Sequence, residues 1–307
     1  MKKIKLLFVG LVLTLTSIEI QAQQLPYTSP LQEMHHIWNP AFTAPGTLME
    51  ASAFYRKQWF GFDNAPNTAF ASIQYPFVDM NMSAGGAIIS DKTGPVSKFG
   101  IELNYAYKLR EIFSDEDQIS LGINGYMFQY SFNPGGEKFN DPDDPLFGTA
   151  SQSGFNPSLG VGFAYFSATE EYGRDNIFYF GLATLQSFSP DLNLASGKAN
   201  REQHIFGNIG VKWMGYGWYL EPSLQVNYVR PELIDYIIGM KYEMEETFWA
   251  GIALSSVNDY TINGGIIMND INGRYTSLKI GAVAGINGSL GTGPSFEFYI
   301  AYRADMD

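Results

Sequence analysis

Residues 48–77 read LMEASAFYRKQWFGFDNAPNTAFASIQYPF, and this stretch decides the predicted fold. It contains two segments in which apolar and polar side chains alternate, joined by a loop rich in glycine and proline. In the first segment, one face carries Ala51, Ala53 and Tyr55 and the other carries Ser52, Arg56 and Gln58. The second segment places Ala69, Ala71, Ile73, Tyr75 and Phe77 opposite Ser72 and Gln74. A period of two with an apolar outer face and a polar inner face is typical of a membrane β-barrel hairpin.

The rest of the chain repeats this alternation. It is clearest in 101–110, 218–228 and 233–243, and it is also present in the glycine-rich segments 81–91 and 258–268. Counted over the whole chain, the pattern predicts an all-β fold, a transmembrane antiparallel outer-membrane β-barrel of about 14 strands. The last strand, 295–303, is expected to close against the first, because closure leaves no unpaired edge in the membrane.

The connections between the predicted strands alternate in length. The long ones are 59–66, 131–154 and 186–202, and the short ones include 215–217, 243–245 and 269–273. Outer-membrane barrels have short periplasmic turns and longer outer loops, so this asymmetry places both termini in the periplasm. Pro231 makes one outer loop very short.

The chain is predicted to have three parts. Residues 1–22 are typical of a signal peptide, with three lysines near the start followed by an apolar run. Residues 23–47 contain four prolines and no strand period, which predicts an irregular arm at the rim or inside the lumen, anchored by Trp38 and Phe42. Residues 48–307 form the barrel.

Composition agrees with an exported membrane protein. Without residues 1–22 the chain has 16 basic and 30 acidic residues, so no electrostatic footprint for nucleic acid is expected. It has no cysteine, which excludes disulfides, thiolate metal sites and cysteine catalysis. The 19 tyrosines and 23 phenylalanines suit the aromatic girdles of a barrel in outer-membrane lipid.

Four motifs in order resemble the PorP/SprF family of outer-membrane proteins, which belong to the type IX secretion and gliding machinery. They are Asn39-Pro40-Ala41-Phe42; Tyr55-Arg56-x-Gln58-Trp59-x-Gly61-Phe62-x-x-Ala65-Pro66-x-Thr68; Asp91-Lys92-x-Gly94-Pro95; and Asn104-Tyr105-Ala106-Tyr107. The resemblance implies a non-enzymatic component of the type IX apparatus that assists secretion or surface retention of cargo proteins. Its implied partners are type IX secretion components and the C-terminal domain of secreted cargo.

Two motif loops are the candidate partner-binding site, because a 14-stranded count places 61–66 and 91–95 on one outer rim. The candidate residues are Arg56, Gln58, Trp59, Gly61, Phe62, Ala65, Pro66, Asp91, Lys92, Gly94 and Pro95. The aromatic members are equally explained as girdle residues. Arg56 is expected to pair with Asp63 or Asp91.

Charged residues on the inner face have two interpretations. They include Arg56, Glu102, Lys108, Asp235, Lys241 and Glu243. A paired network in the lumen is favoured over a permeation or docking surface, since the same charges facing lipid would cost about 2–4 kcal/mol near the midplane.

Chemical sites are weakly indicated. The three histidines, His35, His36 and His204, have no metal-ligand spacing, and no nucleophile is grouped with a base, so no catalytic residue, metal site or cofactor is predicted. The acidic segment 140–145 is expected to be a solvated loop more than a calcium site. Gly160, Gly162, Gly207, Gly210 and Gly281 are expected to mark bends or close backbone approach.

The alternative function is a transport barrel for a small solute, resembling porins or fatty-acid transporters, and an outer-membrane hydrolase is a weaker third. A plugged lumen favours the secretion component, and an open lumen favours the transporter.

Overall fold

The computed structural model describes ten segments of the chain. They are residues 33–133, 151–169, 176–188, 192–194, 197–199, 202–244, 247–256, 259–270, 276–287 and 293–306. The predicted signal peptide and the acidic segment 140–145 lie outside them. Within them, no helix is long and apolar enough to cross a membrane.

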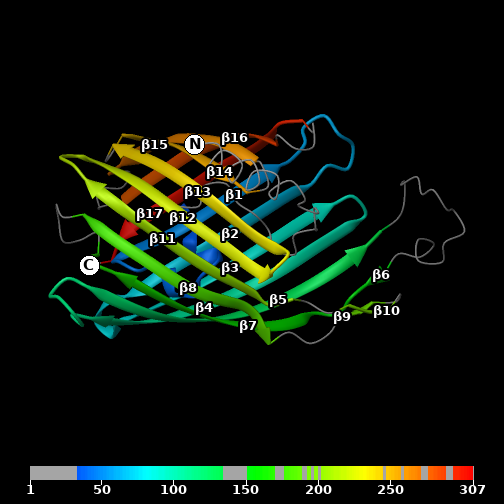
Figure 1. Ribbon diagram of the computed structural model, residues 1–307, viewed down its shortest axis with the longest axis horizontal. Coiled ribbons are helices and arrows are strands. Elements are labelled where there is room, and N and C mark those ends of the chain that lie inside the picture. The colour runs from blue at the N-terminus through cyan, green and yellow to red at the C-terminus, as the bar shows by residue number, and fades with distance from the viewer. Residues whose placement is uncertain are drawn as a thin grey trace, which may run out of the picture.

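Fourteen antiparallel strands form one closed barrel, as the alternation predicted (Figure 1). The wall strands are β1 (Leu48–Lys57), β2 (Asn67–Phe77), β3 (Met82–Thr93), β4 (Val96–Arg110), β5 (Gln118–Phe132), β7 (Asn156–Phe166), β8 (Ile177–Phe188), β11 (His204–Met214), β12 (Trp218–Arg230), β13 (Leu233–Met244), β14 (Phe248–Ser255), β15 (Asp259–Asn269), β16 (Thr276–Asn287) and β17 (Ser295–Asp305). Outside the wall, β6 (Ser151–Gln152) pairs antiparallel with the far end of β5, and β9 (Leu192–Leu194) pairs with β10 (Gly197–Ala199).

The barrel closes between its first and last strands. The register of β1 with β17 runs from Leu48 opposite Asp305 to Lys57 opposite Phe296, which confirms the predicted closure. We call the end where β1 begins and β17 ends the terminal end, and the opposite end the far end. The connections 215–217 and 231–232 are short, and the longest separations, between β5 and β7 and between β8 and β11, lie at the far end.

The wall has the two faces that the sequence predicted. On β2, Ile73, Tyr75 and Phe77 are exposed on the outside, whereas Ser72 and Gln74 are buried inside. The alternation in 101–110 and 233–243 predicts apolar residues on the outer face. Of these, Leu103, Tyr105, Ile234 and Ile238 are exposed, and Ile101 and Tyr242 are half-buried. Apolar side chains exposed in one band around a closed barrel are what a bilayer would cover.

The interior is not uniformly polar, and here the prediction of a polar inner face is only partly right. A buried apolar cluster includes Phe54, Phe70, Phe128, Phe206 and Trp249 from the wall. These large side chains face inward because the N-terminal arm gives them apolar partners, among them Ile37 and Trp38. The part of the lumen around Ile37 and Trp38 is therefore a packed apolar core.

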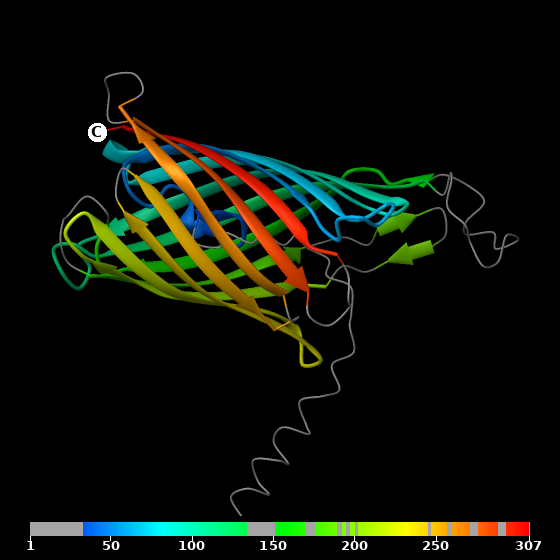
Figure 2. The ribbon, with the colours of Figure 1, turned by 90° about the horizontal axis from the view of Figure 1, so that it is seen from above.

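The arm lies inside the barrel as two short 3-10 helices, η2 (His35–Ile37) and η3 (Pro40–Phe42), seen in blue between the walls in Figure 2. Trp38 and Phe42 are buried, as predicted for its anchors. A third 3-10 helix, η4 (Val78–Met80), forms the turn between β2 and β3 at the terminal end.

Candidate functional site

The far rim is built around the connection between β1 and β2. Gln58 N donates to Pro66 O at 2.9 Å, which closes the base of this loop, and Phe62 N donates to Trp59 O at 3.1 Å in a tight turn. The backbone is left-handed at Trp59 (φ 51°), Gly61 (φ 100°) and Asn64 (φ 55°). Only the glycine adopts such a conformation without steric cost, so the other two depend on the surrounding bonds.

The second motif loop joins the first. Gly94, with φ 55°, and Pro95 form a two-residue hairpin between β3 and β4, and the glycine suits the positive φ that such turns require. Gly94 N donates to Asn64 O at 3.1 Å. The structure therefore brings 61–66 and 91–95 together at one rim, as the strand count predicted.

A third connection supports the first loop from its other side. Phe60 N donates to Pro294 O at 2.8 Å, and the ring of Phe60 meets that of Phe296 edge-on at 5.7 Å. Despite these contacts, Phe60 is 57% exposed and Phe62 is 54% exposed. We define the far rim as residues 58–66 with Gly94 and Pro95; it presents exposed aromatic rings on bonded loops.

The remaining candidate residues have different surroundings. Ala65 and Pro66 are buried at the base of the loop, and Lys92 is exposed. Asp91 accepts a hydrogen bond from Thr68 Oγ1 at 2.6 Å. Arg56 is buried inside the barrel, with Nη2 at 4.0 Å from Asp259 Oδ2, instead of pairing with Asp63 or Asp91. Arg56 thus belongs to the inner wall, below the exposed surface.

The lumen plug, residues 33–47, contains the motif Asn39-Pro40-Ala41-Phe42. Asn39 Oδ1 accepts from Ala41 N at 2.9 Å and caps the short helix, while its amide donates to Phe163 O on β7 at 3.0 Å. This motif packs closely against the barrel wall at positions occupied by glycine. A Cβ on Gly122 would lie 2.3 Å from Ala41 N, and one on Gly162 would lie 2.1 Å from Asn39 Oδ1.

Close approach is therefore confirmed for Gly162, one of the glycines singled out in the sequence. Gly210 and Gly281 lie similarly close to the rings of Tyr179 and Trp249, and Gly160 lies close to Thr184 O. At Gly207, in contrast, an added Cβ would meet only an ordinary contact with Leu182 at 3.5 Å.

Polar bonds hold the rest of the plug to several strands. Ala44 N donates to Gln74 Oε1 at 2.9 Å, Gln118 Nε2 donates to Pro45 O at 3.1 Å, and Lys108 Nζ donates to Gly46 O at 3.2 Å. His36 Nδ1 accepts from Gln74 Nε2 at 2.9 Å. Burial lowers the pKa of His36 to about 3, so this ring is neutral near pH 7.

An ion cluster joins the plug to the opposite wall. Its members are Glu33, Glu50, Lys241, Glu243, Lys279 and Arg303. Glu33 pairs with Lys241, with Lys279 at 3.5 Å and with Arg303 at 3.1 Å. Burial alone would raise the pKa of Glu33, but these three cations hold it below its usual value. The predicted paired network in the lumen is found for Lys241 and Glu243, which contact each other at 2.8 Å.

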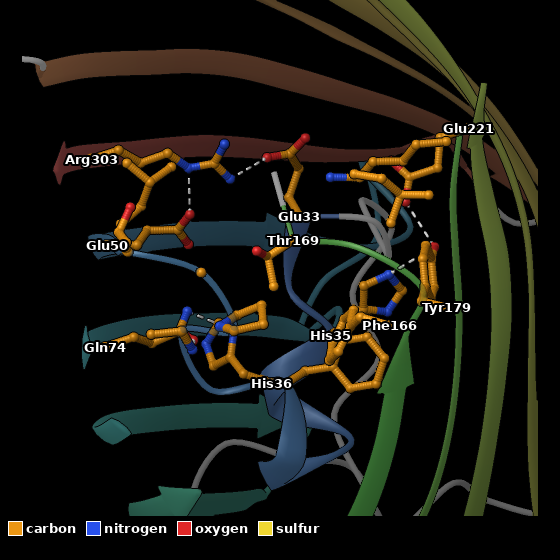
Figure 3. A pocket seen from close by; sticks show the side chains of 18 of the residues that line it. Glu33, His35, His36, Glu50, Gln74, Phe166, Thr169, Tyr179, Glu221 and Arg303 are labelled. Atoms are coloured by element: carbon orange, nitrogen blue, oxygen red, sulfur yellow. Dashed lines mark hydrogen bonds and ion pairs between the residues drawn. The ribbon is translucent and has the colours of Figure 1, made fainter. Parts of the chain in front are cut away.

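A cavity of about 410 Å³ lies beside the plug at the terminal end, and we call it the terminal-end cavity. Its lining includes Leu48 and Asp305, at the ends of the first and last strands. Figure 3 shows Glu33, His35, Tyr179 and Glu221 around this space, with Glu50 and Arg303 on another side.

Together, a closed 14-stranded wall, an exposed apolar outer face and a plugged lumen define an outer-membrane type β-barrel. Solved structures agree on this class. The barrel resembles the Ralstonia pickettii toluene transporter TbuX, with a TM-score of 0.54 at 10% identity over 88% of this chain and 92% of that one. It also resembles the monoaromatic hydrocarbon channel CymD, with a TM-score of 0.52 at 10% identity over 91% and 94%. A third is a Pseudomonas aeruginosa FadL homologue, with a TM-score of 0.51 at 8% identity over 88% and 93%.

At such low identity these likenesses concern the fold alone. The family is shown by sequence: the profile of the type IX secretion system membrane proteins PorP/SprF matches residues 20–302, and the chain belongs to this family. The resemblance drawn from the four motifs is confirmed. No curated protein sequence matches this chain.

Sequence reasoning missed two features of the site. Phe54 and Phe70 stack at 5.2 Å inside the lumen, and their inward position in otherwise polar faces was the available signal for a plug. Glu33 as the centre of the ion cluster had no such signal, because its partners lie more than 200 residues away in sequence.

Proposed function

We propose that this barrel serves type IX secretion as a non-enzymatic docking component in the outer membrane, which assists the release or surface retention of cargo at its far rim. Family membership supports the secretion role. The observation that carries the docking role is the exposure of Phe60 and Phe62 on loops that are bonded to one another.

The geometry suits binding of a protein. Exposed aromatic rings on restrained loops lose little conformational entropy when a partner covers them, and aromatic residues dominate the binding energy of protein interfaces. The far end also carries the longest connections, and the short periplasmic turns typical of such barrels support an orientation in which this end faces the cell surface. The proposed partners are other type IX components or the C-terminal domain of secreted cargo.

The packed lumen supports docking over solute transport. The plug and the apolar cluster around Phe54, Phe128 and Trp249 occupy the interior that a solute would cross. Passage would require moving the plug, whose Glu33 pairs with three buried or partly buried cations. The solutes named for TbuX and CymD belong to those proteins.

Site-specific cross-linking in the native host tests this proposal. A photoreactive phenylalanine analogue at position 62 is expected to capture a type IX component or a cargo protein, identified by mass spectrometry. The matched control places the same analogue at Ile238, which is 51% exposed on the outer face of β13. Absence of protein cross-links at position 62, or the same products from both positions, would refute the docking role.

A further inference from the structure

The terminal-end cavity contains acceptor groups that take no part in the docking proposed for the far rim. Glu221 on β12 is 1% exposed and lines the cavity together with His35 of the plug and Glu50 of β1. These three residues come from separate elements and meet around one space at the end opposite to the far rim.

The hydrogen bonds of Tyr179 determine which of the neighbouring atoms carry protons. Its hydroxyl donates to Glu221 Oε1 at 2.7 Å, and it lies 3.2 Å from His35 Nε2 (Figure 3). A hydroxyl has one proton, so the second bond requires His35 Nε2 to donate. Burial lowers the pKa of His35 to about 3, so the ring is neutral and its Nδ1 is a bare acceptor.

Three buried acceptors then remain unsatisfied. Glu221 Oε2, Glu50 Oε1 and His35 Nδ1 have no hydrogen-bond partner among the residues that the structure describes. Buried acceptors without donors are costly, particularly when one belongs to a carboxylate. These three atoms lack hydrogen-bond donors, and a cationic donor would supply the missing bonds.

The cations of the cavity wall are engaged elsewhere. Arg303 donates to Glu50 and Glu33, Lys241 pairs with Glu33 and Glu243, and the Lys212 ammonium lies 5.2 Å from the centre of the Tyr219 ring. An anionic ligand would therefore meet cations that already have partners, and would also face the free oxygen of Glu221.

The aromatic lining favours an organic cation. Phe42 and Tyr179 lie 5.8 Å apart edge-on, and Phe42 meets Phe166 at 5.0 Å, so rings form one side of the cavity. Aromatic faces attract guanidinium and ammonium groups. The described residues contain no group of three or more side chains placed to hold a metal ion. A volume near 410 Å³ fits a long side chain with part of its backbone.

We propose that the terminal-end cavity binds a guanidinium or ammonium group on a peptide side chain, with Glu221 as the charge partner, His35 Nδ1 as a second acceptor and the aromatic lining around the alkyl stem. The peptide would enter from the terminal end, where the cavity is lined by the ends of β1 and β17.

The test uses the full-length barrel purified in detergent and isothermal titration calorimetry. N-acetylarginine amide is expected to bind saturably and at least tenfold more tightly than N-acetylcitrulline amide, which has the same shape without the charge. Glu221→Gln is expected to weaken arginine-amide binding at least tenfold. The glutamine keeps an acceptor for Tyr179, and heat-modified gel mobility reports whether the variant barrel is folded.

The matched control is Glu102→Gln. Glu102 is also 1% exposed, but it faces the lumen away from the cavity, where it accepts from Asn104 and Asn124. This variant should bind the arginine amide as the wild type does. Equal binding of the two amides by the wild type, or unchanged binding by folded Glu221→Gln, would overturn the proposal. Binding of putrescine without binding of the arginine amide would overturn the assignment to a peptide.

Discussion

The far rim and the lumen plug are both made from short motifs rich in glycine, proline and aromatic residues, but their aromatic rings have opposite surroundings. In the plug, Trp38 packs on Phe206 at 5.2 Å and is 5% exposed. At the rim, Phe62 is 54% exposed although its loop is held by hydrogen bonds. Aromatic side chains are therefore packed in the core of the barrel in one region and exposed to solvent in the other.

Glycine also has different tasks in the two regions. Gly122 and Gly162 lack a side chain because the plug occupies that space, so substitution there acts through packing. Gly61 and Gly94 have nothing within 4 Å of an added Cβ but require positive φ, so substitution there acts through the backbone. The comparison predicts that plug variants alter stability and that rim variants alter binding.

The largest effect is expected from removing the charge at the centre of the plug. Glu33→Ala leaves Lys241, Lys279 and Arg303 with one buried counter-charge fewer, which should destabilise the docked plug by about 3–5 kcal/mol. Hydrogen exchange of residues 33–47 in the purified barrel measures this loss. Phe62→Ala is the control from the other region and should leave that exchange unchanged; equal protection in Glu33→Ala and the wild type would contradict the role of the ion cluster.

A packing variant should have the next largest effect. Gly122→Val places carbon atoms where Ala41 N and Pro40 C now lie, 2.3 and 2.4 Å from the Cβ position, and should cost about 1–3 kcal/mol of plug docking. Raised ion conductance in planar bilayers would report the displaced plug. Gly125→Val on the same strand is the matched control, because its added Cβ has only Leu103 O near, at 4.0 Å. Equal conductance in the two variants would show that Pro40 and Ala41 do not pack closely against Gly122.

Acid should loosen the plug through His36. The pKa of this buried ring is about 3, below the ordinary value of 6.5, so the undocked arm binds a proton that the docked arm cannot. The contribution of His36 to docking stability is therefore present above pH 6.5 and falls as pH drops, by about 1.4 kcal/mol at pH 5.5, or roughly tenfold in the docking equilibrium. His35, whose pKa is also lowered to about 3, adds a similar loss. Hydrogen exchange of the arm, corrected for intrinsic rates, should show this change at pH 5.5, and His36→Gln should reduce the pH dependence. If the pH dependence of exchange were the same in His36→Gln and the wild type, it would arise from other titratable groups.

The sequence predicted the wall better than the interior. The alternation in segments such as 101–110 depends on neighbouring residues only, and the strands there agree with it. The plug depends on contacts between distant segments, such as Asn39 with Phe163 O and Glu33 with Lys241, and no local pattern encodes which pairs meet. Trp38 and Phe42 indicated that the arm is anchored. The wall glycines that contact it, Gly122 and Gly162, lie on different strands, and no local pattern links them to the arm.

The candidate rim was predicted in part for the same reason. Successive strands run in opposite directions, so the loops that contain Gly61 and Gly94, two connections apart, were predicted at the same end of the barrel. In the structure these loops are joined by the hydrogen bond from Gly94 N to Asn64 O. The partner of Arg56 could not be predicted, because Asp259 lies on β15 and reaches the site only through barrel closure.

The most direct test of the docking claim compares Phe62→Ala with Phe113→Ala in the native host, measuring membrane-inserted barrel and released cargo in the same cultures. Phe113 is a matched control, 77% exposed in the connection between β4 and β5 at the terminal end. Both exposed substitutions should change stability by no more than about 0.5 kcal/mol. The docking account predicts that Phe62→Ala lowers cargo release per inserted barrel and that Phe113→Ala does not. Cargo release that falls only in proportion to inserted barrel in Phe62→Ala would contradict it and leave the rim aromatics as membrane-anchoring groups.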